Sequence, residues 1–376
     1  MIKIKKESIF TCVVALSFVL TTITELRIPG MPVGPGEIMM LFSSGVMFLK
    51  KRQTTPEQIH LQHIVINFWM VLFSSLLLGT MMNLLTMQRG LSFRTFAAYL
   101  FSAFVSYSIV RCYDEKFVQS IVKATIVIGA ILFFTLCIYA KYKSKELFGL
   151  ELMYYHRFCG GAKNPNQLAL FLVPIPFIAI HFASDALDVK NLRAAIGWML
   201  IGVACVYVGI QTNSDAIVGA WVIGIAYYVY RIAFQKLRVW ERMLILFLIF
   251  AVMLSVFHKE IVYIISNWFS GLDGDGSRAA LWRSGLESAL DSLFMGYGPG
   301  AYGLSNYEIH NTYLDILTQG GLIAFVDFLY LLICDFRASH KTILRCTSLV
   351  SLCAFLMGHF ALRQPVLFLY IILFLL

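Results

Sequence analysis

Long apolar runs alternate with short polar segments along most of this chain. Many of the runs reach roughly 17–25 residues, which is enough for a helix to cross a lipid bilayer. They follow no heptad or longer repeat, so the pattern excludes a coiled coil and a soluble solenoid. We therefore predict about 12 membrane-spanning helices. They are expected to start near Ile9, Glu37, His63, Leu91, Phe117, Gln167, Ala194, Ala216, Met243, Thr312, Ile343 and Val366.

The first apolar run follows three lysines and resembles a signal peptide. It has no small-residue cleavage site and more spans follow it, so we expect it to remain as the first helix. The last run is short for a span. We expect residues 1–376 to form a single integral membrane domain of the all-α class, with every span an α-helix.

Two segments predicted to face outward are too long to be simple connectors: residues 141–166 and 258–310. The second is also the more polar, and we expect it to carry short helices. Long loops of this kind tend to carry function.

Composition supports the membrane assignment, with 59% hydrophobic residues, 14% charged residues and a mean hydropathy of +0.76. The net charge of +9 comes from basic residues that recur in the segments predicted to face inward. This is the positive-inside pattern, so the excess charge reflects topology and gives no reason to expect a nucleic-acid partner. The eight cysteines are scattered without a C-x-x-C pair, which predicts neither a disulfide framework nor a zinc site.

Within the second long loop, Ser277 is a candidate cap for a helix from Arg278 to about Leu290. The sequence GYGPGAYG then predicts a turn. Arg278 and Trp282 are four residues apart and share a helix face, with Arg283 next to Trp282. These side chains can contribute to a functional site. Alternatively, the segment is an amphipathic helix that lies on the membrane surface.

Two other patterns in this loop are rejected. GPGAYG matches a dinucleotide-binding motif in letters only, because no buried strand precedes it. DGDG lacks the glutamate at position twelve of a calcium loop, so a flexible turn is favoured.

His310 and Asn311 stand side by side at the threshold of an apolar helix. Burying them is costly, so they meet either water or a substrate. A single histidine at the edge of a span is more often structural than catalytic. Gly320 and Gly321 follow in the same helix, where we expect them to allow close helix packing.

The first long outer loop contains Arg157, a pair of glycines, and Asn164-Pro165-Asn166 at the start of the next span. Asparagine and proline are natural residues at a helix start, and an arginine there can simply contact lipid head groups. The functional alternative is that Arg157 and the helix N-terminus together attract an anion such as phosphate.

Three segments in this order resemble the O-antigen polymerase and O-antigen ligase family of bacterial envelopes. They are RFCGGAKNPNQLA, QTNSDAIVGA, and SRAALWRSGLESALDSLFMGYGPGAYGLSNYEIHNTYLDILTQGGLIAF. The resemblance covers roughly the second half of the chain, while the first five spans agree only in topology. One position departs from the family, where Ser214-Asp215 stands in place of the usual Ser-Arg.

The resemblance implies a fold similar to the GT-C class of polyprenyl-dependent glycosyltransferases. It implies a multi-pass protein of the bacterial inner membrane, with an active site that faces the periplasm and acts on glycans carried by undecaprenyl diphosphate. The acceptor is a second glycan for a polymerase and lipid A core for a ligase, and chain-length regulator proteins are possible partners. No cofactor or metal is expected. By motif match, Arg157, Arg278 and His310 fall on functional positions.

These residue types suit that chemistry. Guanidinium groups stabilise the negative charge that builds on a leaving diphosphate, which assigns Arg157 and Arg278 to this role with Arg283 in support. A histidine takes a proton near neutral pH, so His310 is the candidate base that deprotonates the acceptor hydroxyl; contact with the diphosphate is the alternative. The predicted substrate-binding residues are Asn164, Asn166, Trp282, Arg283, Asn311 and Tyr313.

The main prediction is thus a polysaccharide polymerase, with the ligase as the alternative. A transporter of lipid-linked glycans is a further alternative from another class. Transporters usually show internal repeats and ionisable residues at mid-membrane. No repeat is found, and Lys123, Asp215 and Asp327 are the few charges near or within spans.

Overall fold

The structure is a computed structural model of the chain. It describes residues 6–29, 31–49, 56–86, 90–111, 115–238, 241, 244, 278–300, 308–340 and 342–375. The first helices are α1 (Lys6–Thr22), η1 (Thr24–Leu26), α2 (Pro35–Leu49), α3 (Pro56–Thr86), α4 (Phe93–Arg111) and α5 (Glu115–Tyr142). After them come α6 (Pro165–Leu172), α7 (Ile175–Asp188), α8 (Leu192–Gln211) and α9 (Asp215–Ala233). The last are α12 (Arg278–Asp291), α13 (Thr312–Ser339), α14 (Ile343–Leu356) and α15 (Pro365–Leu375).

Within the described residues, 7 helices are long and apolar enough to cross a membrane, with α6 and α7 counted as one. Four shorter apolar helices accompany them: α1 (its part Glu7–Thr22), α2, α14 and α15. Every predicted start except the one near Met243 falls in or next to one of these helices, and Met243 lies outside the described residues. The chain is therefore a polytopic membrane protein, and the predicted total of twelve spans is not confirmed.

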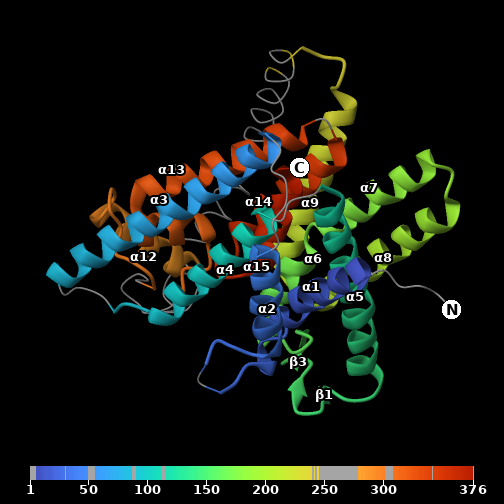
Figure 1. Cartoon of the computed structure of the whole chain (residues 1–376), viewed down its shortest axis with the longest axis horizontal. Coiled ribbons are helices and arrows are strands. Elements are labelled where there is room, and N and C mark those ends of the chain that lie inside the picture. Colours follow the sequence, from blue (N-terminus) through green and yellow to red (C-terminus); the bar gives the residue numbers. More distant parts are fainter. Residues whose placement is uncertain are drawn as a thin grey trace, which may run out of the picture.

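The expectation of purely helical structure misses two small hairpins in the first outer loop. Strands β1 (Glu146–Leu147) and β2 (Leu150–Glu151) form one antiparallel pair, and β3 (Met153–Tyr154) and β4 (Arg157–Phe158) form another. Both hairpins lie at the lower end of the molecule in Figure 1, below α5 and near the loop that joins α1 to α2. Such short strands leave almost no alternation of apolar and polar residues in the sequence.

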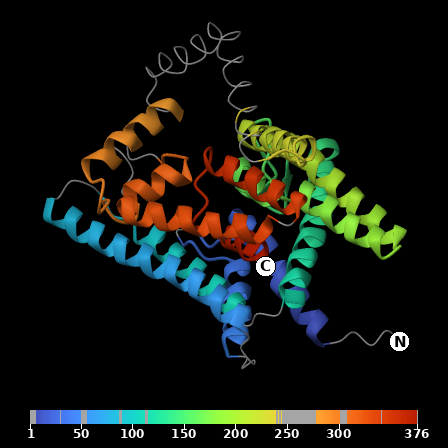
Figure 2. The same ribbon diagram turned by 90° about the horizontal axis from the view of Figure 1, so that it is seen from above.

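Two groups of helices meet around α15. Helices α3 and α13 run side by side on one flank, and α7 and α8 extend as a paired arm on the other (Figures 1 and 2). Helix α15 lies between them and packs against α4, α5, α6, α13 and α14. Its described side chains are almost all buried, which explains why a helix of only 11 residues is apolar on every face.

The predicted span that starts near Gln167 is broken into α6 and α7 at Val173-Pro174. Proline removes a helical hydrogen bond, so neighbouring carbonyl groups need other donors. The indole Nε1 of Trp221 donates to the Val173 carbonyl at 2.9 Å, and the Tyr370 hydroxyl donates to the Phe171 carbonyl at 2.7 Å. The break is thereby fixed by α9 and α15, and it leaves α6 as a short helix that begins at the outer loop.

Candidate functional site

Arg157 lies where strand β4, helix α6 and the turn between α8 and α9 come together. Its Nε donates to the Thr212 carbonyl at 3.0 Å and its Nη2 donates to Oδ1 of Asn166 at 3.1 Å. The Ser214 hydroxyl donates to the same Oδ1 at 2.8 Å. Asn166 and Ser214 are both buried. The guanidinium is therefore held in one orientation by groups from two other elements, and the predicted proximity of Arg157 to a helix N-terminus is found.

The sequence CGGAKNPN explains why the chain turns here. Gly160 and Gly161 have φ of +57° and +78°, a region that glycine enters without strain. A Cβ on Gly161 would lie 2.8 Å from Cγ2 of Ile23, so a side chain there would force Ile23 to move. Asn164 then caps α6, accepting from the Asn166 amide at 2.9 Å, and Pro165 is the first helical residue. The predicted helix start is confirmed, with Asn164 in a capping role.

The loop after α1 braces this turn. The Glu25 amide donates to the Gly161 carbonyl at 3.0 Å, and the Thr24 hydroxyl donates to the Ala162 carbonyl at 2.9 Å. Glu25 also accepts from the Glu151 amide. The loop itself is closed by the ion pair of Arg27 and Glu37 at 2.7 Å. Thr24 and Glu25 thus support the Arg157 turn from the start of this loop.

Replacing Glu25 by glutamine is expected to raise thermal stability slightly at pH 8, by an amount on the order of 1 °C. Burial raises the pKa of the Glu25 carboxyl, and the Glu151 carboxylate adds to this shift. A raised folded-state pKa means that the charged form destabilises the fold above that pKa, and the penalty disappears as the pH falls through it. Glutamine keeps the acceptor oxygen without the charge. Melting curves in detergent at several pH values test this; a gain that grows toward low pH contradicts it.

His310 and Asn311 lie at the start of α13, as predicted. Asn311 is the N-cap, and its Oδ1 accepts from the amides of Tyr313 at 3.0 Å and Leu314 at 3.2 Å. Asn311 is 5% exposed, so its cap bonds are shielded from water. His310 is half-buried, with its Nδ1 enclosed, and has φ of +55°. Non-glycine residues rarely adopt this conformation, and when they do it often marks a functional position.

The loop between α14 and α15 lies beside these residues, and sequence reasoning missed it. The Thr312 hydroxyl donates to the His359 carbonyl at 2.6 Å and accepts from the Ala361 amide at 3.1 Å. Arg363 forms an ion pair with Glu308, and its guanidinium lies 4.7 Å from the centre of the Phe360 ring. The signal was present in the sequence, since GHFALRQ places His359, Arg363 and Gln364 between two apolar helices.

A continuous set of contacts joins Arg157 to His310. Asn166 binds both Arg157 and Ser214, and Ser214 is the N-cap of α9. Two residues further, Ala216 lies against Gly358, where an added Cβ would be 3.0 Å from the Ala216 Cβ. The loop that begins at Gly358 then binds Thr312, which follows the His310-Asn311 pair. The two outer segments singled out in the sequence therefore meet through α9 and the α14–α15 loop.

Helix α12 confirms the helix predicted from Arg278 to about Leu290. A Cβ on Gly285 would lie 2.8 Å from Cδ1 of Ile309, so α12 packs directly against the residue before His310. The Thr318 hydroxyl also donates to the Gly285 carbonyl at 3.2 Å. Arg278 is the first residue of α12, two turns before Gly285, and its side chain and the candidate cap Ser277 lie outside the described part of the chain.

The other predicted binding residues differ in their placement. Trp282 is half-buried on α12, while Arg283 is exposed and pairs with Glu287 at 2.9 Å. The Tyr313 hydroxyl donates to the Cys353 carbonyl at 3.0 Å, and the ring packs on Phe328, which places this side chain in the interior between α13 and α14.

The turn after α12 docks onto a kink in α13. Gly321 has φ of 68° inside that helix, which interrupts its hydrogen bonds. The amides of Tyr297 and Gly298 donate to the carbonyls of Thr318 at 2.9 Å and Gln319 at 2.8 Å, and the Leu322 amide donates to the Leu293 carbonyl at 2.7 Å. The close helix packing expected at Gly320-Gly321 is found at Gly320, where an added Cβ would lie 3.6 Å from the Cβ of Ser75 on α3. Gly321 forms the kink, which holds the glycine turn against α13.

Asp215 does not cap α9. Ser214 occupies the N-cap position, although its hydroxyl is used by Asn166, and Asp215 is the exposed first residue of the helix. A carboxylate in the first turn interacts favourably with the positive end of the helix dipole.

Comparison with known proteins adds one match. Residues 196–329 match the model of a family described as O-antigen ligase. The matched segment runs from α8 through α12 into α13 and includes Ser214, Gly285 and His310. No curated protein matches the chain.

Proposed function

We propose that this protein transfers a glycan from undecaprenyl diphosphate to a glycan acceptor. The proposal starts from the match of residues 196–329 to the O-antigen ligase family. The observation that carries the proposal is the set of contacts that joins the anchored Arg157 guanidinium to the His310-Asn311 pair. The reaction occurs at the periplasmic face of the bacterial inner membrane, with residues 141–166 and 258–310 as the periplasmic loops of one integral membrane domain.

Arg157 receives the diphosphate end of the donor. The bond between the anomeric carbon and the phosphate oxygen breaks, and its electron pair stays on the diphosphate. A guanidinium has five N–H donors in a planar fork, and two of them already bind Thr212 and Asn166. These bonds fix the orientation of the guanidinium before the donor arrives, so the protein reorganises little as negative charge develops on the diphosphate. Arg278 supplies the second guanidinium.

His310 accepts the proton of the acceptor hydroxyl as its oxygen forms the new bond to the anomeric carbon. An imidazole suits this role near neutral pH. The cap of Asn311 and the bonds of Thr312 fix the backbone immediately after His310. Arg363 and Glu308 lie in the same region as an ion pair. No metal ion is assigned a step.

The acceptor decides between two activities. A polymerase adds the growing chain to a second lipid-linked repeat unit, and this is our main proposal. A ligase transfers the finished glycan to lipid A core. This is the second candidate, and the description of the matched family supports it.

A gel of surface glycans from the source bacterium separates these activities. Deletion is expected to leave lipid A core bearing one repeat unit, and His310→Ala expressed at the wild-type level is expected to fail to restore the ladder. Bare core together with long lipid-linked chains identifies the ligase. A lipid-linked unit that stays on the cytoplasmic side identifies a transporter.

The matched control is His340→Ala. His340 is an exposed histidine at the opposite end of α13, so its loss is expected to leave the ladder intact. Restoration of a full ladder by His310→Ala overturns the assignment of His310 as the base.

A further inference from the structure

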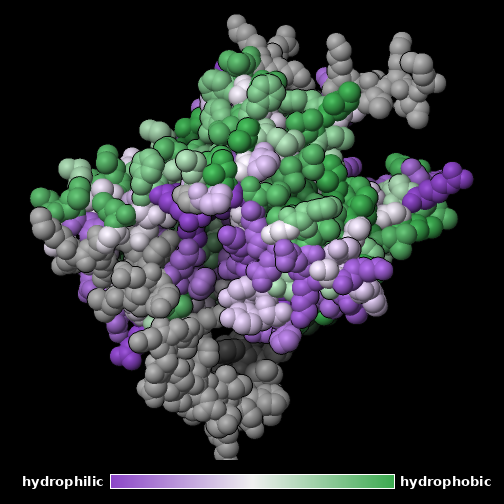
Figure 3. Space-filling view, turned by 90° about the horizontal axis from the view of Figure 1, so that it is seen from below, coloured by the Kyte–Doolittle hydropathy of each residue, from purple (hydrophilic) through white to green (hydrophobic). Residues whose placement is uncertain are grey.

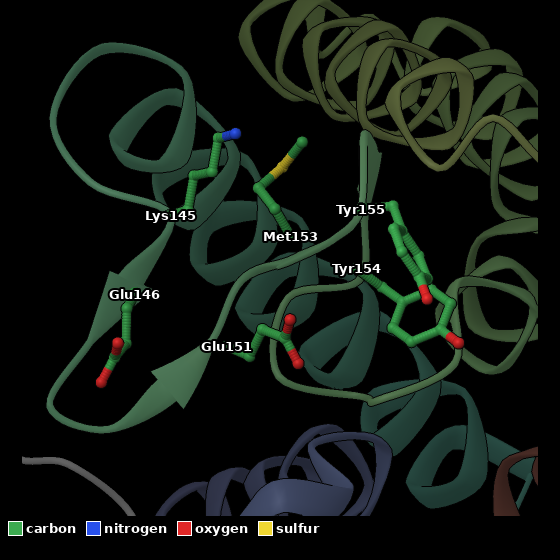
Figure 4. A pocket seen from close by; sticks show the side chains of 6 residues that line it. All are labelled: Lys145, Glu146, Glu151, Met153, Tyr154 and Tyr155. Atoms are coloured by element: carbon green, nitrogen blue, oxygen red, sulfur yellow. The ribbon is translucent and has the colours of Figure 1, made fainter.

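A cavity of about 500 Å³ lies between the two hairpins of the first outer loop. Its lining residues are Lys145, Glu146, Glu151, Met153, Tyr154 and Tyr155. Figure 4 shows the two tyrosines together on one side, Glu146 and Lys145 on the other, and Glu151 and Met153 between them. The contacts described above for Arg157 and His310 involve none of these six side chains.

The tyrosine pair is presented to solvent by the backbone. The rings of Tyr154 and Tyr155 lie edge to face, with centroids 4.8 Å apart and an interplanar angle of 84°. Tyr155 is 76% exposed and has φ of 54°, because it stands in the turn that joins β3 to β4. A left-handed tyrosine that leaves most of its ring in water is costly for folding alone. Aromatic faces of this kind bind ligands that have a flat apolar side and polar edges.

The acidic residues indicate which ligand fits. Glu146 and Glu151 are paired across β1 and β2, so two exposed carboxylates stand opposite each other. Like charges in this position are unfavourable without a partner. Hydroxyl groups of a sugar donate hydrogen bonds to carboxylates, whereas anionic lipid head groups are repelled by them. Hydrophilic side chains also gather in the middle of the face seen in Figure 3, the view from below, where the hairpins lie.

The cavity adjoins the strand that carries Arg157. Tyr154 is the direct partner of Arg157 in the β3–β4 register. The Leu152 carbonyl accepts from the amides of Cys159 at 2.9 Å and Gly160 at 3.1 Å, which ties the hairpins to the glycine turn. The backbones of Tyr154 and Arg157 therefore lie one strand spacing apart, about 5 Å, so the tyrosine pair is a neighbour of the residue assigned to the diphosphate.

We infer that this cavity is a glycan-binding subsite, in which a sugar ring of the substrate stacks on Tyr154 or Tyr155 and its hydroxyls donate to Glu146 and Glu151. The inference rests on the proposed function for its substrate class. It adds a site for recognition of the sugar, at a distance from the groups that act on the diphosphate.

Binding of a defined sugar tests the inference. The probe is the repeat-unit oligosaccharide, without lipid, released from the surface polysaccharide of the source bacterium. Its dissociation constant is measured by calorimetry on the full-length protein in detergent. Tyr154→Ala and Tyr155→Ala are expected to weaken binding about tenfold each, the size typical of losing a central aromatic contact. Glu151→Gln is expected to weaken it less, since the amide retains one acceptor.

Phe148→Ala is the matched control. Phe148 is 97% exposed in the turn between β1 and β2 and does not line the cavity, so binding is expected to be unchanged. Melting temperatures of all variants establish that they are folded. Equal affinity of the wild-type protein and both tyrosine variants overturns the inference, and so does a wild-type protein that fails to bind the probe.

A second assay distinguishes failure of the proposed function from failure of the subsite. Transfer from a lipid-linked donor is measured on the same preparations, with His310→Ala as the inactive reference that is expected to keep its affinity for the oligosaccharide. Tyrosine-dependent binding without any transfer by the wild-type protein supports the subsite and contradicts the glycosyltransferase. Transfer whose KM for the lipid-linked donor is unaffected by Tyr154→Ala and Tyr155→Ala contradicts the subsite alone.

Discussion

Replacing Arg157 by lysine is expected to reduce glycan transfer by at least about 100-fold while the protein still folds, a loss typical of removing one donor to a developing negative charge. Lysine keeps the positive charge but has one nitrogen on a flexible stem. It cannot bind the Thr212 carbonyl and Asn166 Oδ1 together as the Arg157 fork does. Transfer from a lipid-linked donor, measured on purified protein, tests this, and the loss is expected in kcat more than in KM.

Lys163→Asn is the control for this experiment. It removes a positive charge from the same loop, and asparagine tolerates the left-handed conformation of residue 163, which has φ of 55°. Near-normal transfer is expected, because Lys163 is exposed. An Arg157→Lys protein with normal transfer would show that only net charge is needed at this position, and the role of the anchored fork would be wrong.

Replacing Gly321 by alanine is expected to destabilise the protein by about 3 kcal/mol or more and to abolish transfer. The new Cβ would lie 2.3 Å from the Phe294 carbonyl oxygen, at a residue with φ of 68°. Relief of this clash separates the glycine turn from α13 and breaks the bonds of Tyr297 and Gly298. Because α12 is held by the same turn, its position beside Ile309 is lost as well. A fall in melting temperature of at least about 6 °C is expected.

Gly197→Ala provides the comparison. Gly197 lies within α8, and a Cβ there meets nothing within 4 Å. Alanine favours a helix over glycine by roughly 1 kcal/mol, so this variant is expected to be equally or slightly more stable. If Gly321→Ala melts like wild type and retains transfer, the kink is not what positions α12.

The sequence predicts the helices well because their signal is long and repeated. An apolar run such as Glu115–Tyr142 leaves no alternative to a helix in a bilayer. The local starts at Asn164 and Asn311 were also predictable, since each places a capping residue directly before its helix. The sequence alone therefore indicates the long helices and their capped starts, but not the two short hairpins of the first outer loop.

The sequence contains no comparable signal for contacts between residues that are far apart along the chain. The Ser214 hydroxyl and Arg157 share one oxygen of Asn166, although 48 residues separate Ser214 from Asn166. His359 is 47 residues from Thr312, so the sequence around Thr312 does not point to it. In the sequence, Gly320-Gly321 indicates helix packing and gives no sign of the kink. The glycine turn that docks at the kink comes about 20 residues earlier. Partners of this kind are chosen by the tertiary fold.

The length of α14 has a consequence for the depth of the loop that follows it. Helix α14 has 14 residues and measures about 21 Å, against a hydrocarbon layer of about 30 Å. The loop after it, with His359 and Arg363, therefore cannot reach the outer head-group plane if α14 starts at the inner one. Polar backbone at that depth requires enclosure by protein or by water. The protein itself supplies this enclosure, because His359, Phe360, Ala361 and Leu362 are all buried.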